Sequence, residues 1–242
     1  SEMCIRDRRE ARHARLPLLI ASDAVHGLNN CAGATIFPHN VGLGCARDAE
    51  ALVGAVAAAT AREARAAGTN LIFAPCVAVA ADVRWGRTYE SFGADGARVA
   101  ALGAAAVRGV REGGCERVIA CLKHYLGDGE TTDGTGVGGR LDQGDCALSD
   151  AELRARHLPA YAAGVRAGAL AVMASFSSVR GVSMHAHEYW LTTVLKGELG
   201  FKGFVISDLD GLDRLLGGSA GGGGGAGGGG GGGGGGERAP PC

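Results

Sequence analysis

The chain has 242 residues, a formal net charge of −1 and 44 glycines. This charge gives no reason to expect binding to nucleic acid or a membrane surface, and no apolar run reaches the roughly 20 residues of a membrane span. Eight cysteines lie without any C-x-x-C pair, so the sequence indicates neither a zinc site nor a redox dithiol. We therefore expect a small or neutral ligand, with no cofactor and no metal.

The two ends of the chain differ in composition from the middle. Residues 1–15 have no hydrophobic periodicity and look like translated sequencing-adaptor sequence, so we expect a non-native leader there. Residues 217–236 are glycine apart from one serine and two alanines. Such a tract has no side chains that bury a core, so residues 217–242 are predicted to be a disordered tail. The predicted domain is residues 16–216.

Short apolar runs and alanine-rich helices alternate through this domain. Strands are predicted at residues 16–23, 71–75, 118–122, 170–176 and 204–206. Helices are predicted at residues 48–67, 96–112, 149–166 and 188–198, each ending at or near a glycine. Ser149 and Glu152 have the spacing of a capping box at the start of the third helix.

The repeated order of strand, long loop, helix, glycine and short turn indicates a β/α fold, because each crossover is long enough to join parallel strands. Polar or charged residues follow every predicted strand. A barrel gathers all its strand ends around one centre, whereas an open sheet gathers its ligand mainly at one switch point. We therefore expect an α/β fold that is a partial TIM (β/α)8 barrel, with about five of the eight strands present.

Charged residues at the strand ends are the candidate site. Asp208 follows the last apolar run after a single serine and would lie at the mouth of the sheet, where α/β folds place their chemistry. The other candidates follow three earlier strands: Asp23, Arg87, Lys123 and His124. Capping of the next helix is an equally good interpretation of Asp208. Lys123 and Arg87 have the alternative of a solvated rim or of a structural ion pair with Asp23.

Six segments, taken in order, resemble the N-terminal barrel domain of glycoside hydrolase family 3. They are residues 23–27 (DAVHG), 35–39 (TIFPH), 84–87 (RWGR), 89–91 (YES), 123–125 (KHY) and 203–208 (GFVISD). The similarity covers about residues 16–215 and is closest to the β-glucosidase and exo-β-glucanase branch. It implies retaining hydrolysis of terminal β-D-glucosyl or related residues through a covalent glycosyl-aspartate intermediate. It also implies a carbohydrate substrate, a β-glucoside or β-glucan oligosaccharide, and a secreted or extracellular location.

By this resemblance, Asp208 is the catalytic nucleophile, and the sugar in the −1 subsite is held through its hydroxyl groups by Asp23, Arg87, Lys123 and His124. The chemistry agrees with these residue types. An ordinary aspartate is ionised at neutral pH, as a nucleophile must be. Charged donors and acceptors make the stronger hydrogen bonds to neutral hydroxyl groups.

The acid/base is the largest departure from the family. In its two-domain branch the acid/base is a glutamate of the second domain, so we expect a further domain to supply it. In the hexosaminidase branch it is a histidine in a KHFPGHG loop, whereas residues 123–129 read KHYLGDG, with Asp128 at that place. Asp128 would serve only if burial kept it protonated, and a glycine-rich loop is a poor place for such burial.

Other departures concern aromatic residues. Leu209 stands where relatives usually have a tryptophan after the nucleophile, and Phe176 stands where they have a tyrosine. Trp85 and Tyr89 are either packing residues or a sugar platform, and we favour packing for Tyr89. The histidines His26, His39 and His185 are expected to be core residues.

Two other functions stay open. One is a Schiff-base aldolase-type barrel lyase that uses Lys123 as the amine nucleophile. The other is a non-catalytic sugar-binding barrel fragment. The fragment itself is expected to be inactive, because its sheet has open edges and it lacks a candidate general acid.

Overall fold

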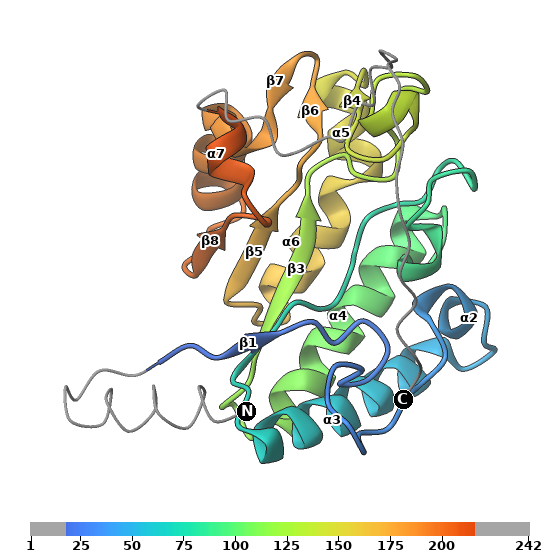
Figure 1. Cartoon of the computed structure of the whole chain (residues 1–242), viewed down its shortest axis with the longest axis vertical. Coiled ribbons are helices and arrows are strands. Elements are labelled where there is room, and N and C mark those ends of the chain that lie inside the picture. The colour runs from blue at the N-terminus through green and yellow to red at the C-terminus, as the bar shows by residue number, and fades with distance from the viewer. Residues whose placement is uncertain (1–17, 216–242) are drawn as a thin grey trace, which may run out of the picture.

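The computed structural model describes residues 18–215, whose central element is a five-stranded parallel sheet (Figure 1). In spatial order its strands are β1 (Ala21–Ser22), β2 (Leu71–Ile72), β3 (Ile119–Tyr125), β5 (Ala171–Ala174) and β8 (Phe204–Ile206). Every neighbouring pair is parallel. The predicted α/β fold with five parallel strands is therefore confirmed. Within the described residues, β1 and β8 are the two edges of the sheet.

Helices cover one face of this sheet, with α4 (Gly96–Gly113) between α3 (Ala49–Ala67) and α6 (Leu158–Arg166) (Figure 1). Small residues allow the close approach of α3 and α4. A Cβ atom added to Gly113 would lie 2.1 Å from the carbonyl oxygen of Ala58. The main core fills the layer between sheet and helices, where Leu122 and Val107 are fully buried.

The helix predicted at residues 48–67 is present, and Gly68 ends it in the left-handed conformation with φ 85°. The capping box of Ser149 and Glu152 is also present. The single helix predicted at residues 149–166 is wrong: it is divided at His157 into α5 (Asp150–Arg156) and α6. Pro159 in the first turn of α6 explains the break, because proline in a helix interior removes a hydrogen bond and clashes with the preceding turn.

The last predicted helix is a π-helix, η4 (Tyr189–Glu198). Strand lengths also differ from the prediction, since β1 and β2 are shorter than the apolar runs and β3 continues to Tyr125. The polar residues that end β3 are thus part of the strand itself.

A second, three-stranded sheet was not predicted. It contains β4 (Asp145–Cys146), β6 (Ser178–Val179) and β7 (Val182–Ser183), and it lies beyond the carboxyl ends of β3 and β5 (Figure 1). The short helices not yet named are α2 (Asn40–Gly44), η1 (Thr88–Glu90), η2 (Val137–Gly139), η3 (Met184–Ala186) and α7 (Gly211–Leu215). Two-residue strands carry too little periodicity to be recognised in a sequence.

The predicted leader and the predicted glycine-rich tail both fall outside the described residues. In the part of the chain that the structure describes, no helix has the length and apolar character needed to span a membrane.

Candidate active site

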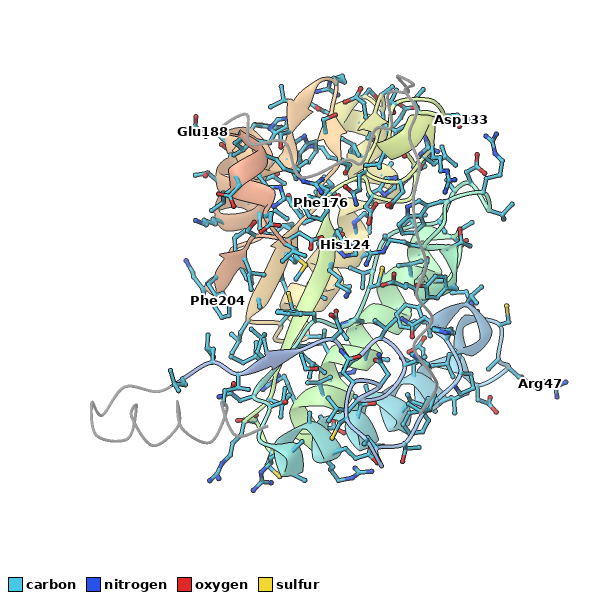
Figure 2. All side chains as sticks on the ribbon, viewed as in Figure 1. Arg47, His124, Asp133, Phe176, Glu188 and Phe204 are labelled. Atoms are coloured by element: carbon cyan, nitrogen blue, oxygen red, sulfur yellow. The ribbon has the colours of Figure 1, made fainter. Side chains whose placement is uncertain are left out.

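The predicted site residues from three strands lie together at the carboxyl ends of the strands of the main sheet. Asp23 follows β1, Lys123 and His124 are among the last three residues of β3, and Asp208 comes two residues after the end of β8. Figure 2 shows His124 at the carboxyl end of β3, with Phe176 just beyond the end of β5. Because the strands are parallel, their carboxyl ends meet at the same edge.

Lys123 and Asp23 form an ion pair between the ends of β3 and β1. The Lys123 Nζ donates to Oδ1 of Asp23 at 3.1 Å. The lysine side chain is 4% exposed and the aspartate side chain 52%. Since a buried lysine side chain needs a hydrogen-bond partner, Asp23 satisfies Lys123 at the carboxyl ends of the strands. The exposed part of the Asp23 carboxylate remains open to a ligand.

His124 lies between two carboxylates. Its Nε2 is 3.8 Å from Oδ2 of Asp208, and its Nδ1 is 2.8 Å from Oδ2 of Asp128. The second distance is short, but Nδ1 makes no aligned hydrogen bond. The imidazole is buried, so these two aspartates fix the polar surroundings of its ring.

Arg87 is paired with Glu90, not with Asp23. Its guanidinium donates to both carboxylate oxygens, from Nε at 2.6 Å and from Nη2 at 3.1 Å. Burial by itself would lower the pKa of Arg87, but the hydrogen bonds to Glu90, and then the charge of Asp128, raise it above its ordinary value. Arg87 is therefore a permanent cation, and Asp128 acts on both Arg87 and His124.

The backbone around Asp208 is held by several hydrogen bonds. Its Oδ1 accepts from the Leu209 N–H at 2.7 Å, and its own N–H donates to Nε2 of His185 at 3.2 Å. The Ser207 hydroxyl donates to the Asp208 carbonyl oxygen at 2.6 Å. The Asp208 side chain is 17% exposed, so its carboxylate is partly shielded while still open to a ligand.

Sequence reasoning missed three of these contacts: Glu90 as the partner of Arg87, Asp128 as the neighbour of His124, and His185 beside Asp208. The first two have a local signal, because Glu90 follows Arg87 by three residues and Asp128 follows His124 by four. His185 has none, since it reaches Asp208 from a separate element.

The expectation that the glycine-rich loop would leave Asp128 unburied is wrong, because Asp128 is 4% exposed. Gly127 and Gly129 both have φ 89°, a conformation that lets the loop fold inward. A Cβ atom on Gly129 would lie 2.6 Å from the carbonyl oxygen of Val79, so the loop packs directly on that backbone. The glycines therefore bury the aspartate instead of exposing it.

The two aromatic residues of the segment at residues 84–91 differ in burial. Trp85 packs in the interior, and its Nε1 donates to Oδ1 of Asp142 at 3.2 Å. Tyr89, for which we favoured packing, is 45% exposed and meets the ring of His39 edge-on. The described residues contain no cluster of three or more His, Cys, Asp or Glu side chains that could hold a metal ion.

Comparison with known proteins agrees with this geometry. Residues 1–216 match the family model of the glycosyl hydrolase family 3 N-terminal domain. The "Lysosomal beta glucosidase" of Dictyostelium discoideum is 33% identical over 84% of this chain and 25% of its own length. A "Beta-xylosidase" of Formosa agariphila is 35% identical over 83% of this chain and 28% of its own length.

Solved structures show the same relationship. The exo-1,3/1,4-beta-glucanase from a Pseudoalteromonas species has a TM-score of 0.75 and 41% identity, covering 81% of this chain and 24% of that one. The beta-glucosidase from Listeria innocua in complex with glucose has a TM-score of 0.75 and 32% identity, covering 83% and 27%. The chain thus spans about a quarter of the length of the relatives described here. It belongs to glycosyl hydrolase family 3, as its six sequence segments suggested.

Proposed function

We propose that the protein that carries this chain hydrolyses terminal β-glucosyl or related residues with retention of configuration, using Asp208 as the nucleophile. The observation that carries this proposal is the position of the Asp208 carboxylate. It lies at the end of β8, partly shielded from water and 3.8 Å from Nε2 of His124. The named relatives are a β-glucosidase, a β-xylosidase and an exo-glucanase, which supports a β-glycoside as the substrate class.

The proposed reaction has two steps. In the first, an Asp208 oxygen bonds to the anomeric carbon while the bond from that carbon to the leaving-group oxygen breaks, and this oxygen takes a proton from a general acid. In the second step, water attacks the anomeric carbon and gives a proton to the residue that was the general acid in the first step. The bond from the anomeric carbon to Asp208 breaks, which releases the carboxylate. Two inversions give net retention.

The remaining predicted site residues would bind the sugar. The exposed carboxylate of Asp23 would accept from a hydroxyl group, and the buried cation Lys123 would donate to one. Arg87 and His124 would supply further donors from the neighbouring strand ends. Such preorganised groups stabilise the transition state most when water is excluded from the site.

The general acid is proposed to come from outside the described residues, as a glutamate of a further domain. Two buried carboxyl groups near the site are already engaged: Glu90 by the Arg87 guanidinium, and Asp128 by His124. Glu90 and Asp128 are each only 4% exposed, so neither carboxyl group is accessible to a leaving group.

The structure argues against the Schiff-base lyase. A lysine attacks a carbonyl group as the neutral amine, and an enzyme obtains this state by desolvation or by a neighbouring cation. Lys123 is instead 4% exposed, and its Nζ is hydrogen-bonded to the Asp23 carboxylate at 3.1 Å, so its amine is not free to approach a carbonyl carbon. A sugar-binding role without catalysis is separated from the proposed function by the following experiment.

A 2-deoxy-2-fluoro-β-glucoside with a dinitrophenolate leaving group should inactivate the protein and leave its sugar on the peptide that contains Asp208. This leaving group needs little protonation, so the first step does not depend on the general acid. Asp208→Asn is the control and should stay unlabelled. A label on Lys123 or on another carboxylate would refute the proposal, and reversible sugar binding without any label would favour the non-catalytic role.

A further inference from the structure

His185 contacts Asp208 although it has no role in the chemistry proposed above. It belongs to η3, which also packs against α7, the helix that follows Asp208. The Nε2 atom of His185 accepts a hydrogen bond from the backbone N–H of Asp208 at 3.2 Å. This bond ties the end of β8 to an element 23 residues earlier in the chain.

The hydrogen bond sets the protonation state of the ring. Nε2 accepts a hydrogen bond only when it carries no proton, so the neutral ring has its proton on Nδ1. The backbone of Ser175, at the end of β5, is the second hydrogen-bond partner of the ring. Burial lowers the pKa of His185, more than the negative charge of Asp208 raises it, while Arg214 lowers it further. The ring is therefore neutral at pH 7.

The ring is half-buried and has further neighbours. The Phe176 ring centroid lies 5.8 Å from that of His185, and the Arg214 guanidinium covers Phe176 at 3.9 Å from its centroid. Arg214 is held in turn by a hydrogen bond to Oε1 of Gln143 at 2.6 Å. A Cβ atom on Gly211 would lie 2.2 Å from Nε2 of His185, so only glycine fits beside the ring in this position.

We propose that His185 is a positioning residue that holds the Asp208 backbone in the place from which its carboxylate attacks the sugar. The proposal rests on the proposed role of Asp208 as the nucleophile. Oδ1 of Asp208 accepts a hydrogen bond from the backbone N–H of the next residue, Leu209. Any shift of the backbone at Asp208 therefore moves the carboxylate with it. A displacement of about 1 Å at a reacting group is enough to lower a rate strongly. His185 acts through Asp208 and need not touch the substrate.

The test compares His185→Leu with His185→Gln in the protein that carries this chain. Leucine removes the acceptor for the Asp208 N–H, whereas the glutamine side-chain oxygen can replace it. With a dinitrophenyl β-glucoside, the leucine variant should lose about tenfold in kcat, the effect of leaving one shielded N–H unpaired, with KM changed less than about twofold. The glutamine variant should recover most of this loss.

His187→Leu is the matched control. His187 follows on the same short segment, but the charges that act on its ring are those of Arg180 and Asp150, and not that of Asp208. This variant should keep the wild-type kcat. A loss as large as that of His185→Leu would mean that the segment matters only for folding, and would overturn the positioning role.

A spectroscopic measurement covers the case in which His185→Leu does not fold. In wild-type protein labelled with 15N-histidine, the His185 signals at pH 7 should show a proton on Nδ1 and none on Nε2. A proton on Nε2 would overturn the proposal without any activity data.

Asp208→Asn, assayed in parallel, separates the two proposals. If it is inactive while a folded His185→Leu has the wild-type kcat, the positioning role alone fails. If Asp208→Asn keeps wild-type turnover, the proposed nucleophile fails, and the positioning role with it.

Discussion

Lys123 and Asp23, one hundred residues apart in the chain, form an ion pair at 3.1 Å across the carboxyl edge of the sheet. The lysine is buried and the aspartate is half exposed. The pair joins β3 to the end of β1 and leaves part of the carboxylate open to a ligand. This one ion pair thus stabilises the fold and also holds Asp23 and Lys123 in place in the proposed sugar subsite.

Asp23→Ala should weaken binding of a monosaccharide analogue by about 2 to 4 kcal/mol, because both a sugar hydroxyl group and the Lys123 ammonium lose their partner. Asp23→Asn should lose less, since the amide oxygen still accepts a hydrogen bond. Isothermal titration with the analogue gives both values. An unchanged affinity in Asp23→Ala would place Asp23 outside the subsite.

Arg87→Lys should raise KM about tenfold or more, because lysine cannot make the two-oxygen contact with Glu90 that fixes the guanidinium. The matched control is Arg84→Lys. Arg84 is also paired with carboxylates, those of Asp82 and Asp133, but its side chain is largely exposed. Steady-state kinetics on an aryl β-glucoside should show wild-type values for Arg84→Lys. Equal effects of the two substitutions on KM would contradict the proposed role of Arg87 in binding the sugar.

The fold was largely readable from the sequence, because five apolar runs, alanine-rich helices and the capping box at Ser149 are all local signals. The small sheet of β4, β6 and β7 was not, since its two-residue strands have no periodicity. In the candidate site, the residues at strand ends were identified by their position. The inward fold of the loop around Asp128 and the contact of His185 with Asp208 depend on tertiary packing, which no local pattern reports.

The free energy of unfolding should fall as the pH is lowered from 7 to 5.5. Burial is the largest cause that lowers the pKa values of His39, His185 and His187 below the ordinary 6.5. The unfolded chain therefore binds more protons than the folded chain below about pH 6.5, which favours unfolding. Urea denaturation at both pH values measures the change, and His185→Gln should reduce it. A stability that rises over this interval would contradict the lowered pKa values of these histidines.

Two glycine substitutions test the packing of α3 against α4. Gly113→Ala should destabilise the fold by a few kcal/mol, because the new methyl group would meet the Ala58 backbone at 2.1 Å. Gly54→Ala is the control. Its Cβ atom has only an ordinary contact, at 3.7 Å from the Ala105 carbonyl oxygen, so it should stabilise α3 by about 0.5 to 1 kcal/mol. Thermal unfolding of both variants measures the two effects. Similar melting temperatures would contradict the close contact between α3 and α4 at Gly113.

The proposed nucleophilic role of Asp208 is tested most directly by the stereochemistry of azide rescue. Asp208→Gly should be inactive on a dinitrophenyl β-glucoside, since no carboxylate remains to attack the anomeric carbon. Added azide would fill the vacated place and attack from the same face, so turnover should be restored with an α-glucosyl azide as the product. A β-glucosyl azide, or wild-type hydrolysis by Asp208→Gly without azide, would contradict it.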